Sequence, residues 1–195
     1  EVLERQARAT RLVGRDALPY WERALRLHEG VGDTGKQAEM HFNLGQHYRL
    51  FAPLAQVDLE KARAQYEQAL QLLDGEGDSA LLAEVYRGMS AVVFSADEGV
   101  EKATDWARKS CTVAEKIGDA RAFCLAAHAL GVLLVIAGHV EEGVNKCQRS
   151  WEVALQLREP DSVGSTGNIL LVVFEMLKDA TSMVAKGSEA LTAVR

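Results

Sequence analysis

The sequence predicts an all-α fold built from repeated helix pairs, and three observations indicate it. Gly-Asp pairs recur along the 195 residues at nearly constant intervals. Apolar residues between these pairs recur at helical spacing, and small residues return at fixed places in the second half of each interval. Self-similarity at a fixed period of this length is the signature of a repeat architecture in which each unit stacks on the next.

The Gly-Asp pairs are expected to form the turns between units. They stand at 32–33, 77–78 and 118–119, with Pro160-Asp161 as a diverged fourth copy, and their spacings are 45, 41 and 42 residues. Glycine supplies the left-handed stop of one helix, and the following aspartate can cap the next helix. The predicted units therefore span residues 1–31, 32–76, 77–117, 118–159 and 160–195.

The first helix of a unit is indicated by a small residue twelve positions after the turn aspartate. Gly45, Ser90 and Gly131 occupy this place in the second, third and fourth units. Apolar or aromatic residues stand one before and three after each of them, as Leu44 and Tyr48 do around Gly45. That spacing forms one face of an amphipathic helix.

The second helix of each unit is indicated by a pattern with small residues seven positions apart. Its copies begin at Ala17, Ala62, Ala103, Gly143 and Ala180, and Ala, Gly or Ser holds the first and last places in all five. Helices that cross closely need small side chains at the crossing. Three departures accompany the pattern: residues 1–13 lack the markers of a first helix, an insertion lies around 51–54, and the fifth unit has a weak first helix.

The segment Leu44-Gly45-x2-Tyr48, followed by Ala62-x3-Tyr66-x2-Ala69, resembles the tetratricopeptide repeat (TPR) family. The resemblance implies a right-handed superhelical solenoid of about five antiparallel helix pairs, forming a single domain over residues 1–195. The repeat style is also similar to the TPR arrays of bacterial signalling regulators, the large LuxR-type transcription activators and the signal-transduction ATPases. Because the sequence opens at Glu1 rather than methionine, we expect a fragment of a longer protein.

The resemblance also implies that the first helix of each unit lines a concave groove. The carboxylate clamp of some TPR proteins is not expected, because Phe42, Ala91, His128 and Val132 replace its Lys and Asn. The predicted groove is polar in the second unit, where side-chain amides can pair with a peptide backbone, and apolar in the fourth. In a second interpretation the apolar fourth-unit face, Ile136 included, is buried core. The predicted groove residues are Phe42, Asn43, Gln46, Arg49, Arg87, Phe94, His128, Val132 and Val135.

His128 is the only polar residue in the apolar stretch 122–138. It is either a groove contact or a buried imidazole bonded to a backbone carbonyl, and the second interpretation is favoured because buried polar groups normally find a partner. The stretch is 17 residues long and lacks flanking basic clusters, so a buried helix is favoured over a membrane span.

Composition and motifs exclude several classes of function. The formal net charge of −6 disfavours direct binding to nucleic acid. Cys111, Cys124 and Cys147 form neither a zinc pattern nor a disulfide framework, and with no signal segment they indicate a cytoplasmic protein. The glycine motif at 30–35 follows a helical segment rather than a strand, which favours a turn over a nucleotide loop. No catalytic residues, metal ligands or cofactor are expected.

These observations predict a non-enzymatic scaffold that binds a protein or peptide in its groove. The alternative is an effector-sensing or regulatory arm of a larger bacterial transcription regulator or signal-transduction ATPase. Residues 179–195 carry few charges and end on Leu191 and Val194, so the C-terminal helix pair is expected either to stack on further repeats of a longer protein or to self-associate with a second copy.

Overall fold

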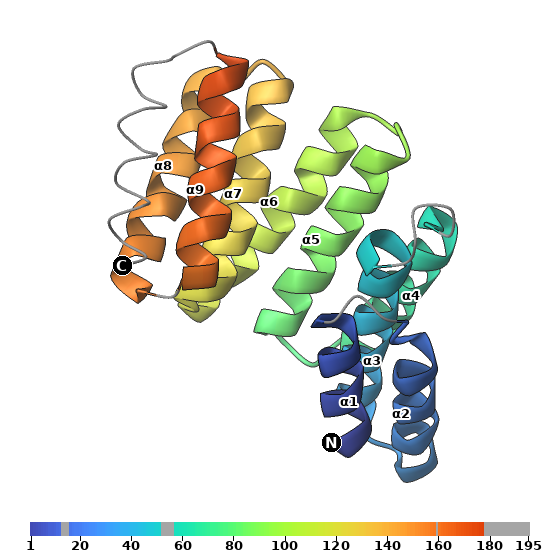
Figure 1. The fold of residues 1–195 in the computed structure, drawn as a ribbon. Helices are drawn as coiled ribbons and strands as arrows, with labels where there is room; N and C mark the ends of the chain where they lie inside the picture. The colour runs from blue at the N-terminus through green and yellow to red at the C-terminus, as the bar shows by residue number, and fades with distance from the viewer. Residues whose placement is uncertain (13–15, 52–56, 159, 178–195) are drawn as a thin grey trace. The chain divides into compact units, whose positions relative to one another are not determined.

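The computed structural model describes residues 1–12, 16–51, 57–158 and 160–177 (Figure 1). These ranges are helical throughout apart from short connections, and they contain no strand, which confirms the predicted all-α class. The elements are α1 (Val2–Leu12), α2 (Leu18–Val31), α3 (Thr34–Gln46), the π-helical turn η1 (His47–Phe51), α4 (Leu59–Leu73), α5 (Ala80–Ser95), α6 (Val100–Ile117), α7 (Ala120–Ile136), α8 (Val140–Leu157) and α9 (Pro160–Met176).

The helices gather into two compact units. The first unit holds residues 1–77 with 91–97, and the second holds 78–90 with the residues from 98 onward. In the first unit each helix from α1 to α4 packs on the next. In the second unit α6, α7, α8 and α9 do the same, and α7 also packs on α9 (Figure 1). Helices α7 and α9 are the first helices of two successive repeats, and stacked helix pairs require such a contact between first helices.

Two of the Gly-Asp turns have the predicted geometry. Gly32 and Gly118 adopt left-handed backbones, with φ of 69° and 67°. The carboxylates of Asp33 and Asp119 then accept hydrogen bonds of 2.9 Å from the backbone N–H groups of Lys36 and Ala122. The helix stop and the cap of the next helix are therefore confirmed at both turns.

The third turn departs from that pattern. Gly77 is left-handed, with φ of 84°, but the hydroxyl of Ser79 accepts the hydrogen bond from the Leu82 N–H group at 3.1 Å. The expectation that Asp78 caps this helix is wrong, because α5 begins at residue 80 and Ser79 holds the capping place. Asp78 instead forms an ion pair with Lys116 at the end of α6.

Glycines allow the two helices of a pair to approach closely. A Cβ added to Gly45 on α3 would lie 2.6 Å from the ring of Tyr66 on α4. A Cβ on Gly131 of α7 would lie 2.8 Å from the carbonyl oxygen of Gly143 on α8. No real side chain tolerates such distances, so the predicted role of these small residues at helix crossings is confirmed.

Each compact unit has its own apolar core. In the first unit the buried cluster centres on Trp21, which is fully buried between α1 and α3 residues such as Ala7 and Met40. In the second unit it centres on Trp151, with residues of α7, α8 and α9 around it. The three cysteines are free and buried, as expected.

Several predictions concern residues outside the described ranges. Residues 52–54 of the insertion lie there, as do the copy of the small-residue pattern that begins at Ala180 and the whole segment 179–195. Self-association through the C-terminal helix pair therefore stays a prediction, and so does a single domain over 1–195. The weak first helix of the fifth unit is formed as α9.

Candidate partner-binding surface

The first compact unit positions four of the predicted groove residues on adjoining helical segments. Phe42, Asn43 and Gln46 lie on α3 and Arg49 lies on η1, and all four are partly exposed. The opposite side of α3 is anchored by buried Met40 and Leu44. An apolar face turned to the core therefore leaves the polar side chains at the surface, as expected of an amphipathic helix.

Two of these four side chains are held by contacts within the unit. The amide nitrogen of Asn43 donates a 2.9 Å hydrogen bond to the carbonyl oxygen of Glu39, one turn earlier. The ring of Phe42 lies 6.1 Å, between centroids, from the ring of Tyr66 on α4. The surface is thus partly ordered before any partner arrives, which reduces the entropy lost on binding.

Arg49 is the most unusual of the four. Its Nε is buried, and within the described residues it has no hydrogen-bond partner. Its guanidinium also forms no ion pair with any described carboxylate. Arg49 lies in a π-helical turn, a rare conformation that is frequent at functional sites. It is therefore a cation that can accept an anionic partner group without first breaking an ion pair.

Phe94 belongs to the segment 91–97 of the first compact unit. It lies in the last turn of α5 with 45% of its surface exposed. An aromatic ring with this much exposed surface can serve as an apolar contact for a partner.

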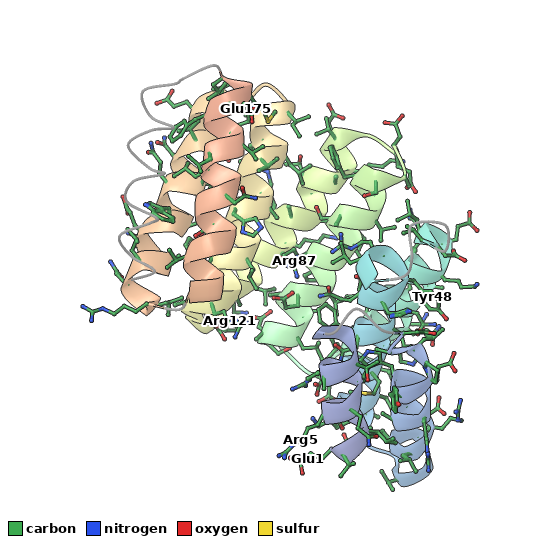
Figure 2. All side chains as sticks on the ribbon, viewed as in Figure 1. Glu1, Arg5, Tyr48, Arg87, Arg121 and Glu175 are labelled. Atoms are coloured by element: carbon green, nitrogen blue, oxygen red, sulfur yellow. The ribbon has the colours of Figure 1, made fainter. Side chains whose placement is uncertain are left out.

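The second compact unit contains Arg87, which is labelled in Figure 2, and His128. Arg87 on α5 is partly buried and donates from Nε to a carboxylate oxygen of Glu84 at 3.1 Å. Burial, together with the positive charge of Arg87, lowers the pKa of His128 on α7 to about 4. His128 is therefore neutral at pH 7 and offers hydrogen-bonding atoms rather than charge.

The favoured interpretation of His128 is wrong in one respect. Its Nδ1 is buried and makes no hydrogen bond to a backbone carbonyl or to any other described group. The carbonyl oxygen of His128 itself does receive a partner, the thiol of Cys147 at 3.9 Å.

The apolar fourth-unit face divides between core and surface. Val135 is only 7% exposed and belongs to the buried cluster around Trp151, with Val132 packed partly buried against that cluster. Ile136, the next residue along, is 40% exposed. Val135 therefore offers a partner almost no surface, while Val132 offers a little.

The nine predicted groove residues thus fall into two groups, one in each compact unit. The structure brings Phe42, Asn43, Gln46 and Arg49 onto one stretch of α3 and η1, and it places Arg87 near enough to His128 to alter its pKa. Sequence reasoning missed Glu84. The available signal was its position three residues before Arg87, a spacing at which opposite charges meet on a helix.

Other chemistry has little support in the described part of the chain. The glycine motif at 30–35 spans the end of α2, a left-handed turn and the start of α3, so no strand precedes it. Over the described ranges, no three His, Cys, Asp or Glu side chains come together as a metal site. None of the helices in those ranges combines the length and the apolar character that crossing a membrane requires.

The fold, by contrast, has clear relatives among solved structures. No protein-family model and no curated protein matches the sequence. Solved structures match in 37 chains, and one is a crystal structure from Podosopora anserina described as a kinesin light chain with nearly identical TPR-like repeats. The match covers 98% of this chain and 92% of the solved chain, with a TM-score of 0.70 and 11% sequence identity. At that identity the match shows the fold alone: a TPR-like helical repeat.

Proposed function

We propose that this protein is a scaffold that binds a protein or peptide through the first helices of its repeats. One observation carries the proposal: within a TPR-like fold, α3 and η1 present a row of partly exposed polar side chains that ends on Arg49, which has no ion-pair partner among the described residues. Helical-repeat proteins commonly use such extended surfaces for binding.

The chemistry of the row favours a peptide that carries an acidic residue. The amide of Gln46 can pair with peptide backbone, which presents both a donor and an acceptor. The guanidinium of Arg49 can form a charge-assisted hydrogen bond with a carboxylate, and such bonds are about twice as strong as neutral ones. In the second unit Arg87 is already paired with Glu84, so it would contribute less to binding.

A peptide-display selection against the whole chain tests the proposal. We expect enrichment of peptides with an Asp or Glu, and fluorescence anisotropy should show about tenfold weaker binding to an Arg49→Gln variant. A Lys102→Gln variant is the matched control, because Lys102 is an exposed cation on α6 outside this surface. Circular dichroism would verify that both variants keep their helices. Selected peptides that bind the Arg49→Gln variant and the wild-type chain equally would contradict the proposal.

The alternative function, an effector-sensing arm of a larger regulator, is favoured by a different observation. The second compact unit contains a cleft of about 360 Å³ between α6, α7 and α8. A small-molecule effector needs a concave site of this size, whereas a peptide scaffold does not.

A further inference from the structure

The cleft in the second compact unit shares no residue with the row on α3 and η1. It is formed by the last turn of α6, the first turn of α7 and the middle of α8. Its volume is within the range of small-molecule sites, about 300–1,000 Å³. The side chains that matter for its chemistry are Ala114, Glu115, Phe123, Lys146, Arg149 and Val153.

Lys146 provides a fixed positive charge at the wall of the cleft. Its Nζ lies 2.9 Å from a carboxylate oxygen of Glu115 and 3.9 Å from the Sγ of Cys111, and 30% of its side chain is exposed. These two contacts join α8 to α6 and hold the ammonium group in place. Because it is held, the group loses little conformational freedom when a ligand arrives.

Arg149 provides a second positive charge, and this one is readily available. Within the described residues its only ion pair is with Glu152 on the same helix, at 3.3 Å, with both side chains more than half exposed. Exposed pairs of this kind contribute little to stability. Arg149 can therefore exchange its ion pair with Glu152 for one with a ligand at little cost in free energy.

The acidic side chains of the cleft are already engaged. Glu115 pairs with Lys146, and one carboxylate oxygen of Asp119 accepts the hydrogen bond from the Ala122 N–H group that caps α7. The charge left without a strong partner is therefore that of Arg149. The partly buried side chains of Phe123 and Val153 also line the cleft and make part of its wall apolar.

We propose that this cleft binds a small molecule in which a carboxylate is joined to an apolar body. The carboxylate would pair with Arg149, Lys146 would contribute less because it is already paired with Glu115, and the apolar body would cover Phe123 and Val153. The proposal deepens the effector-sensing alternative and is independent of peptide binding at Arg49. An available guanidinium and an apolar wall within one cleft select for such a molecule over a purely polar anion or an uncharged ligand.

The first compact unit supplies an internal comparison. It has a cleft of about 310 Å³ lined by residues of α2, α3, η1 and α4, and two of its lining positions correspond to positions in the second cleft. Counted from the starts of their small-residue patterns, Glu29 corresponds to Glu115 and Gln65 to Lys146. The first cleft thus keeps the acid but has a neutral amide where the second has an ammonium group. The first cleft also contains the cation Arg26, but two carboxylates, Glu22 and Glu29, line the cleft with it. Carboxylate binding is accordingly expected to be stronger in the second cleft than in the first.

The probe for the test is 3-phenylpropionate, titrated into the isotope-labelled whole chain while amide resonances are followed by NMR. We expect saturable shifts in the residues of α6, α7 and α8 that line the cleft. The neutral analogue 3-phenylpropanamide should bind about tenfold more weakly, because it cannot form charge-assisted bonds. Acetate should also bind more weakly, because it lacks the apolar body.

Variants assign the binding to the cleft. An Arg149→Gln change should weaken 3-phenylpropionate binding about tenfold. The Lys102→Gln control should leave it unchanged, and so should Arg49→Gln, which separates this proposal from the peptide-binding one. Any of three results would overturn the inference: no saturable shifts at millimolar probe, equal affinity for acid and amide, or unchanged affinity in the Arg149→Gln variant. Shifts confined to the cleft between α2 and α4 would overturn it as well.

Discussion

The buried side chains of Cys124 and Ser150 exchange hydrogen bonds across the contact between α7 and α8. The hydroxyl of Ser150 donates to the carbonyl oxygen of Cys124 at 2.9 Å, and the thiol of Cys124 donates to the carbonyl oxygen of Ser150 at 3.4 Å. The preceding pair repeats half of this arrangement, because Ser110 on α6 donates to the carbonyl oxygen of Ala83 on α5 at 2.7 Å. Ser110 and Ser150 occupy the last place of the small-residue pattern, so that place supplies a hydrogen bond as well as a close crossing.

A Ser150→Ala change tests the contribution of this bond. It removes a buried donor without creating a clash, so the free energy of unfolding should fall by about 1–2 kcal/mol. Thr112→Ala on the exposed side of α6 is the matched control and should change stability by less than about 0.5 kcal/mol. Urea unfolding followed by tryptophan fluorescence gives both values. Equal effects of the two changes would show that the Ser150 bond contributes nothing.

Two glycine-to-alanine substitutions should change the stability of the protein in opposite directions. In a Gly131→Ala variant the added methyl group meets Gly143 and Cys147, so α7 and α8 must separate and stability should fall by about 1–3 kcal/mol. Gly30 lies in the last turn of α2 with nothing within 4 Å of an added Cβ. Gly30→Ala should therefore raise stability by about 0.5–1 kcal/mol through better helix propensity. Thermal unfolding of both variants is the measurement, and a stabilised Gly131→Ala chain would contradict the close crossing.

Replacing the aspartate of two Gly-Asp turns by alanine should lower the free energy of unfolding by different amounts. Asp33→Ala removes the cap of α3 and should reduce the free energy of unfolding by about 1 kcal/mol. Asp78→Ala should have a smaller effect, because Ser79 caps α5 and Asp78 contributes an ion pair with an exposed lysine. Ser79→Ala should reproduce the Asp33→Ala loss. A larger loss from Asp78→Ala than from Ser79→Ala would show that the aspartate is the cap after all.

His128 should make the second compact unit sensitive to acid. Burial and the charge of Arg87 lower its pKa from 6.5 to about 4 in the folded chain. Between those values the unfolded chain binds the proton and the folded chain does not, so stability falls as the pH drops from about 6.5 to about 4 and is level below that. The full effect is about 3 kcal/mol. The free energy of unfolding, measured at several pH values, should fall in the wild-type chain as the pH drops through this range. In a His128→Gln variant the part of this fall that is due to His128 should be absent. An unchanged slope in the variant would assign the acid sensitivity to other groups.

The three cysteines should be unreactive in the folded protein. Burial raises the pKa of Cys111 to about 11 and that of Cys147 to about 12, and a thiol attacks only as the thiolate. Titration with a disulfide reagent should therefore proceed only as fast as the chain unfolds, whereas in denaturant all three thiols should react at once. Rapid reaction of one thiol in the native chain would show that its helix opens locally.

The amino-acid sequence by itself determined the helix pairs of this protein, because the signals for them are local. A left-handed glycine next to a capping aspartate ends one helix and begins another within a few residues, as at Gly32 and Gly118. Small residues such as Gly45 and Gly131 mark crossings because the partner helix is always the next one along the chain. The TPR-like fold follows from repetition of these local rules.

Only the tertiary structure decided what each surface position does, because burial depends on several helices at once. Val135 was a groove candidate by its position on the helix, yet α8 and α9 enclose it in the core. His128 was expected to bond to a backbone carbonyl, yet no described group lies in hydrogen-bonding position at its buried Nδ1, because the packing of the neighbouring helices decides which groups reach the ring. The cleft at Lys146 and Arg149 arises where the end of α6 and the start of α7 meet the middle of α8, and no periodicity within a single helix encodes such a meeting.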